Sequence, residues 1–141
     1  MEELRAAAEA VRQQLNVPAF DEAAVRVLTD FIETQREALG AVDRPNVINA
    51  LGCFLGECLI SAYGGSWQSN TAGVMGIQFG AHTFVRPFEH VDRQLTHGLT
   101  ESVVGFYQSV PERLASAQPA RRLTWIPLPL PATTARRPLN R

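Results

Sequence analysis

The spacing of hydrophobic side chains predicts three helices in the first 63 residues of the chain. Apolar residues recur every three or four positions over residues 2–15 and 21–39, as on the buried face of an amphipathic helix. Asp21 stands where an N-terminal cap is expected, and Gly40 where a left-handed C-terminal cap is expected. Residues 44–63 are apolar on nearly every side, which predicts a buried helix.

The pattern then changes to short runs of strand-forming residues and returns to helical spacing after Pro87. Gly76, inside the second run, predicts a bulge or a close backbone contact. Thr100 stands at the N-cap position of the last helix. The predicted elements are a three-stranded antiparallel meander at roughly 66–69, 74–79 and 82–86, and helices at 88–97 and 101–109.

The composition changes again near Pro111. Six of the nine prolines lie from Pro111 onward, and the stretch LTWIPLPLP at 123–131 favours an extended arm. We therefore expect an α+β fold with one globular domain over residues 1–111. Residues 112–141 are expected to form an extended arm rich in proline and arginine.

Charge divides along the same boundary. The chain has a formal net charge of −1. Residues 1–111 contain thirteen acidic side chains and seven arginines, whereas residues 112–141 contain six arginines and only Glu112. An acidic body with a basic arm suits a protein partner better than nucleic acid, because nucleic-acid affinity grows with the number of phosphates neutralised.

Glu57 is the only Asp, Glu, Arg or Lys between Pro45 and Val85. A buried carboxylate requires hydrogen-bond donors. The candidate donors are the indole of Trp67, backbone N–H groups of the meander, and Arg86 or Arg93. Three roles for Glu57 stay open: a polar pin between helix and sheet, a ligand contact, or a general acid or base.

Two glycines, Gly52 and Gly56, lie four residues apart on the same helix, so another backbone is expected to approach along this strip. Cys53 and Cys58 are also expected there as buried thiols that cannot pair within one helix. Buried free thiols suit a reducing cytoplasm.

Several chemistries find no support in the sequence. The chain contains no lysine, which excludes a P-loop and a Schiff-base lysine. GGSWQ at 64–68 lacks the last glycine of a nucleophile elbow, and no cysteine–histidine group has zinc spacing. We therefore predict no catalytic residue, no cofactor and no metal. The apolar run of the third helix contains Asn49 and Glu57, so we predict a cytoplasmic protein without a membrane span.

The order LGCFLGECL, YGGSW, a short β segment ending in RPF, and HGLTESVVGFY resembles a family of uncharacterised bacterial α+β domains over residues 46–108. The resemblance implies a helix with an LGE core, a GG-x-W turn and a meander, and it implies no activity. The positions that match the family pattern are Gly52, Gly56, Glu57, Gly65, Trp67, Pro87 and Gly98.

Two functions follow as hypotheses. The first is a non-catalytic protein-interaction module of a bacterial cell, such as an adaptor, an immunity-like protein or an assembly protein. It would bind a protein partner or another copy through the arm, using Arg121, Arg122, Trp125, Ile126, Leu128 and Leu130. The alternative is a small-molecule-binding domain or small enzyme centred on Glu57 and Trp67, with Arg86 nearby.

Overall fold

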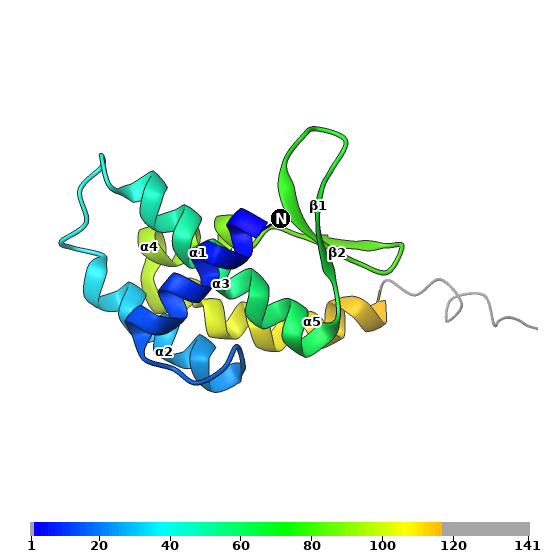
Figure 1. Cartoon of the computed structure of the whole chain (residues 1–141), viewed down its shortest axis with the longest axis horizontal. Helices are drawn as coiled ribbons and strands as arrows, with labels where there is room; N and C mark the ends of the chain where they lie inside the picture. Colours follow the sequence, from blue (N-terminus) through cyan, green and yellow to red (C-terminus); the bar gives the residue numbers. More distant parts are fainter. Residues whose placement is uncertain (1, 117–141) are drawn as a thin grey trace, which may run out of the picture.

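A computed structural model describes residues 2–116. In this part of the chain the fold is α+β, with five α-helices, one 3₁₀ helix and a three-stranded antiparallel sheet, as the sequence predicts (Figure 1). The elements are α1 (Glu2–Leu15), α2 (Glu22–Gln35), α3 (Arg44–Tyr63), β1 (Ser66–Ser69), β2 (Met75–Phe79), β3 (Thr83–Val85), α4 (Pro87–His97), the 3₁₀ helix η1 (Gly98–Glu101) and α5 (Val103–Ser116).

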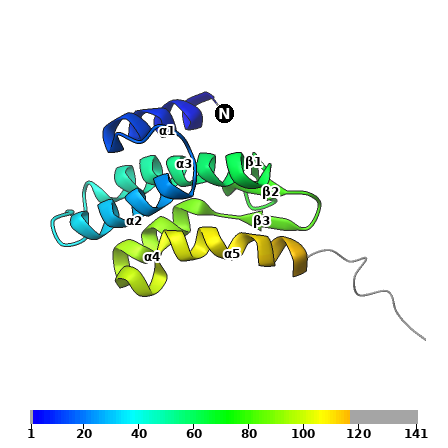
Figure 2. The same cartoon turned by 90° about the horizontal axis from the view of Figure 1, so that it is seen from below.

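The apolar helix α3 is the centre of the fold. Figure 2 shows α1 on one side of α3 and the pair α4 and α5 on the other, with the sheet beside the C-terminal end of α3. Phe54, Leu55 and Leu59 of α3 are completely buried. By length and composition alone α3 would also suit a membrane-spanning helix, but here eight of its residues are buried in the protein core.

The sheet has the strand order β1-β2-β3 and turns one face toward α3. Trp67 of β1 and Val85 of β3 both pair with Ile77 of β2, so these three buried side chains share the inner face. A Cβ atom on Gly76 would lie 2.4 Å from the carbonyl oxygen of Val85. The predicted close backbone contact at Gly76 is therefore confirmed.

Local signals at helix ends were correct in part. Asp21 caps α2, accepting a hydrogen bond from the Ala24 N–H at 3.0 Å, and Gly64 ends α3 at φ +83°. The predicted end of the second helix at residue 39 is wrong, because α2 ends at Gln35 and Gly40 is not left-handed. The next residue, Arg36, instead donates to the Leu95 carbonyl of α4 at 3.4 Å, a tertiary contact that local spacing does not reveal.

One buried glutamine joins three helices. Gln94 of α4 is fully buried, and its side-chain amide donates to the Thr29 carbonyl at 3.0 Å and to Glu33 at 2.9 Å, both on α2. Its side-chain oxygen accepts the Val103 N–H of α5 at 2.9 Å. Ser102, rather than the predicted Thr100, caps α5 by accepting the Gly105 N–H at 3.1 Å. Gln94 and Ser102 together satisfy N–H groups at the start of α5 that have no partner within the helix.

The last helix is longer than predicted. It continues through Pro111 to Ser116, whereas the sequence predicted an end at residue 109. Proline lacks an N–H, so Pro111 leaves the Tyr107 carbonyl without its usual helical partner. The hydroxyl of Tyr63, at the end of α3, donates to that carbonyl at 3.1 Å. A side chain from another helix thus supplies the missing hydrogen bond and allows α5 to extend past the proline.

The substitution Tyr63→Phe tests this account of α5. It leaves the Tyr107 carbonyl without a donor, and we expect a loss of about 1 kcal/mol in the free energy of unfolding. Amide hydrogen exchange at residues 112–116 should also become faster. Tyr107→Phe is the matched control, because the Tyr107 hydroxyl makes no hydrogen bond with residues 2–116. Equal stability and equal exchange in the two variants would contradict the role of Tyr63.

Candidate functional site

The carboxylate of Glu57 meets the indole of Trp67. The Trp67 Nε1–H donates to Glu57 Oε2 at 2.7 Å, which joins α3 to β1. Trp67 is 5% exposed, whereas Glu57 is only half-buried. Of the donors expected from the sequence, the structure thus places Trp67 on Glu57. Water can solvate the other side of the carboxylate, so the site does not contain an isolated buried charge.

The glycine strip of α3 admits aromatic rings. A Cβ atom on Gly52 would lie 2.2 Å from the ring of Phe88, and one on Gly56 would lie 2.2 Å from the indole of Trp67. The two rings contact each other with centroids 5.8 Å apart. The expected close approach of another backbone is wrong here: the atoms nearest to Gly52 and Gly56 are side-chain rings from α4 and β1.

Arg86 does not reach Glu57. Its guanidinium forms an ion pair with Glu89, three residues later, and Arg93 lies 3.5 Å from the other oxygen of Glu89. The i, i+3 and i, i+4 spacing at the start of α4 favours these local pairs. The structure therefore brings Glu57 and Trp67 together and leaves Arg86 in a separate cluster.

Two open cavities share Asn49 and Phe88 in their linings, and we call the pair the Phe88 groove. One part, of about 500 Å³, is lined by residues that include Pro45 and Ile48. The other, of about 400 Å³, is lined by residues that include Leu4 and Met75, and both parts include Phe88. Its charged groups on α3 and α4 are already paired, since Arg44 binds Asp92 at 2.6 Å.

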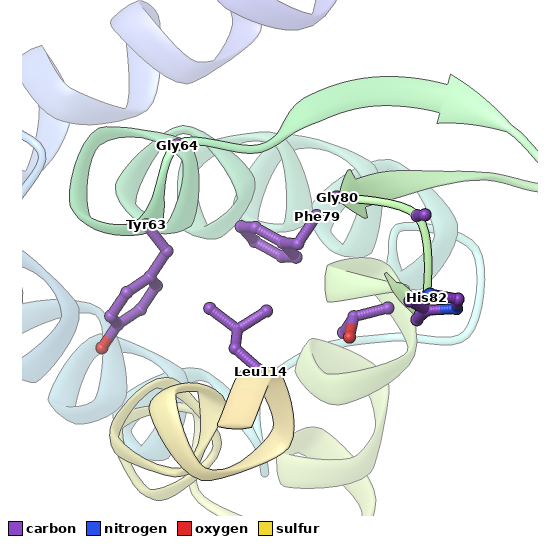
Figure 3. A pocket seen from close by; sticks show the side chains of 8 residues that line it. Tyr63, Gly64, Phe79, Gly80, His82 and Leu114 are labelled. Atoms are coloured by element: carbon purple, nitrogen blue, oxygen red, sulfur yellow. The ribbon is translucent and has the colours of Figure 1, made fainter. Parts of the chain in front are cut away.

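A third cavity, of about 230 Å³, lies between the end of α3, the turn from β2 to β3 and the last turn of α5. We call it the Leu114 cavity. The rings of Tyr63 and Phe79 and the side chain of Leu114 surround its open space, with His82 on one side (Figure 3). A fourth, smaller cavity of about 130 Å³ lies beside Trp67. Glu57 lines none of these four cavities.

The surface charge of the described residues is unevenly compensated. Six arginines between Arg12 and Arg93 form ion pairs with carboxylates of α1, α2 and α4. Seven exposed carboxylates have no ion pair or hydrogen bond with another residue of the range 2–116, namely Glu2, Glu3, Asp30, Glu37, Asp43, Glu101 and Glu112. The unpaired surface charge of the body is thus mainly negative.

The two thiols are buried and unreactive. Burial raises the pKa of Cys53 to about 11 and raises that of Cys58 further, with Asp21 and Glu57 adding a smaller effect at Cys58. A thiol with so high a pKa supplies almost no thiolate at neutral pH. Within residues 2–116 no three His, Cys, Asp or Glu side chains come close enough to hold a metal ion.

His90 of α4 stacks on Phe106 of α5, with ring centroids 3.5 Å apart. Burial lowers the pKa of His90 to about 4, and Arg113 and Arg93 lower it further by repulsion of the charged form. The guanidinium of Arg113 also lies 5.2 Å from the centre of the Phe106 ring. The imidazole is therefore neutral at physiological pH and forms part of the contact between α4 and α5.

Some of the residues predicted to be functional lie outside the described residues, and the sequence pattern does not indicate others that line a cavity or join helices. Arg121, Arg122, Trp125, Ile126, Leu128 and Leu130 of the predicted arm all follow Ser116. The sequence does not indicate Leu114 as part of the folded body, because it predicts that the domain ends at Pro111. The spacing of Phe106, Val110 and Leu114, four residues each, continues the buried face of α5 and was the available signal. No feature of the sequence around Gln94 indicates that its side chain joins three helices.

Comparison with known proteins gave no match for this chain among family models, curated proteins or solved structures.

The substitution Gly56→Ala tests the glycine strip. The new methyl group displaces the Trp67 indole and breaks its hydrogen bond to Glu57, which together cost about 3 kcal/mol. Better helix propensity returns about 1 kcal/mol, so we expect a net loss of about 2 kcal/mol in the free energy of unfolding by urea. Gly40→Ala is the control, because nothing lies within 4 Å of a Cβ there. A Gly56→Ala protein as stable as the Gly40→Ala protein would contradict the assignment.

The lowered pKa of His90 predicts a pH dependence of stability. The unfolded chain binds a proton at His90 below about pH 6.5, whereas the folded chain does so only near pH 4. The contribution of neutral His90 is therefore complete above pH 6.5 and is lost as the pH falls toward 4. The two pKa values alone correspond to about 3 kcal/mol, and we expect about 2 kcal/mol because the ring is partly exposed to solvent. We expect His90→Gln to lose less stability than the wild type over this range in urea titrations.

His97→Gln serves as the control for this measurement, because it removes an exposed imidazole from the same helix. It should follow the wild-type curve. Parallel pH profiles for the wild type and His90→Gln would contradict the prediction.

Proposed function

We propose that the protein is a non-catalytic interaction module of the bacterial cytoplasm, in which an acidic body and a basic arm bind a protein partner. An adaptor, an immunity-like protein or an assembly protein would work in this way. The observation that carries the proposal is the separation of charge along the chain. All fourteen carboxylate side chains precede residue 117, and residues 117–141 contain five arginines and no carboxylate.

The unpaired carboxylates of the body support this proposal. Most body arginines are already occupied in ion pairs, so the seven exposed carboxylates without a partner among residues 2–116 are available to a basic surface. Complementary charge speeds association and selects partners, although each exposed pair contributes little affinity. Binding through such charges should weaken strongly with salt.

The alternative, a small-molecule binder or enzyme centred on Glu57 and Trp67, has less support. The indole occupies Glu57 Oε2, and the cavity beside Trp67 is small and does not include Glu57. Arg86 is engaged with Glu89. An acid–base mechanism would in addition need a second group near the reacting atoms, and among residues 2–116 no second acidic side chain bonds to this pair.

The arm is tested by replacing the five arginines that follow Ser116, Arg121, Arg122, Arg136, Arg137 and Arg141, in the full chain; Arg113 stays unchanged because it lies in α5. Five glutamines remove the charge, whereas five lysines keep it and serve as the matched control. Both variants are used to capture the partner from nuclease-treated host lysate at low salt. We expect the glutamine variant to capture no more than about a tenth of the amount that the wild type captures. The lysine variant should retain most of the partner.

Salt and oligomeric state complete this test. Retention by the wild type should fall as salt rises, and light scattering distinguishes a second copy of the chain from another protein. Equal retention by the glutamine and lysine variants would contradict a role for the arm charge. Material that is captured from untreated lysate but not from nuclease-treated lysate would show that the partner is nucleic acid and would overturn the proposal.

A further inference from the structure

The Leu114 cavity has the size and the lining of a site for one aromatic side chain. Its apolar walls are the rings of Tyr63 and Phe79 and the side chain of Leu114, its polar side chains are His82 and Thr83, and its volume is about 230 Å³ (Figure 3). An apolar cavity of about 150 Å³ is large enough to bind benzene. The Leu114 cavity therefore has room for a larger ring, and residues 2–116 leave it open.

The remainder of the chain supplies one such ring. Trp125 is the only aromatic residue in 117–141, and Ile126 and Leu128 lie beside it. Pro127 and Pro129 alternate with these apolar residues. Such a sequence favours an extended polyproline II conformation, which loses little entropy when it binds an aromatic surface.

The short segment between the cavity and Trp125 favours binding of Trp125 in the cavity of its own chain over binding in that of a second copy. Leu114, a wall of the cavity, lies in the last turn of α5, two residues before the end of the described chain at Ser116. The nine residues from Ser116 to Trp125 can span about 30 Å when extended, enough to turn back to Leu114. A short flexible tether gives an effective concentration in the millimolar range, which a second copy at ordinary protein concentration does not reach.

We propose that Trp125 binds in the Leu114 cavity of its own chain. The inference rests on the proposed function, because it makes the arm an interaction element that is either docked on its own body or released to a partner. Docking covers the rings of Tyr63 and Phe79 and withholds the apolar part of the arm.

The test uses the full chain labelled with 5-fluorotryptophan and observed by ¹⁹F NMR. The chain contains two tryptophans, Trp67 and Trp125, so two signals are expected, and Trp125→Phe assigns them. The Trp125 signal should differ from that of an unfolded peptide and should be protected from a soluble gadolinium chelate. A contact of millimolar affinity is about half occupied at a millimolar effective concentration.

Leu114→Asn removes an apolar wall of the cavity, and Ala115→Asn is the matched control at the neighbouring exposed residue. A tenfold weaker contact leaves about a tenth of Trp125 bound, so relaxation of its signal by the chelate should become about twofold faster in Leu114→Asn. Ala115→Asn should match the wild type. An unchanged Trp67 signal in Leu114→Asn shows that the fold of this variant is intact. If the Trp67 signal changes, Thr83→Arg, which alters another residue of the cavity lining, is used in its place.

Two results would overturn the proposal. In the first, the wild-type Trp125 signal matches the unfolded peptide and does not respond to Leu114→Asn. In the second, dilution removes the protection of Trp125 from the chelate and at the same time halves the mass of the protein in solution, which shows that Trp125 binds the cavity of a second copy. Partner capture is measured separately from docking. If the protein captures a partner but Trp125 is not bound in the cavity, only the docking proposal is refuted. If Trp125 is bound in the cavity but no partner is captured, only the proposed function is refuted.

Discussion

The packing of two aromatic rings on a helix strip without side chains is the constraint on which this structure depends. Gly52 and Gly56 allow Phe88 and Trp67 to lie closer to α3 than any Cβ would permit. Burying an indole of about 200 Å² stabilises the fold by at most about 5 kcal/mol, whereas its hydrogen bond contributes about 1–2 kcal/mol. Burial of the rings therefore supplies most of the stabilisation at this contact between α3, β1 and α4, and the hydrogen bond from Trp67 to Glu57 fixes the orientation of the indole.

A second contact determines where the folded body ends. Tyr63 is the last residue of α3, and its hydroxyl donates to the carbonyl that Pro111 leaves free in α5. Without that donor, the usual cost of a proline within a helix favours an earlier end. The extra turns carry Leu114 to the side of Tyr63 and Phe79, and so create the cavity in Figure 3.

The sequence predicted those features that neighbouring residues determine. The apolar pattern of residues 44–63 placed the central helix α3, Asp21 marked the start of α2, and the short runs of strand-forming residues that follow gave the three strands in the correct order. The absence of any other charged residue between Pro45 and Val85 singled out Glu57, and Trp67 was among its candidate donors.

The errors arise where a distant residue decides the local structure. Gly40 has a local capping signal, but the contact of Arg36 with α4, 59 residues away, accompanies an earlier end of α2. Pro111 has a local stop signal that Tyr63, 44 residues from Tyr107, overrides. Arg86, one of several candidate donors to Glu57, shows the opposite case: it pairs with its sequence neighbour Glu89 and not with a residue distant in the sequence.

Charge and shape would act at different distances in the proposed interaction. Attraction between exposed charges is largely screened beyond about 8 Å at physiological salt and fixes no orientation, so the arginines of the arm alone cannot select one place on the acidic body. An apolar cavity acts only on contact, but it selects a side chain by size and shape. The Leu114 cavity lies where the described body ends and the arginine-rich segment follows, so the two effects meet at one place on this chain. A partner that competes for the arm must then offer both carboxylates and an apolar pocket, which is a more selective requirement than negative charge alone.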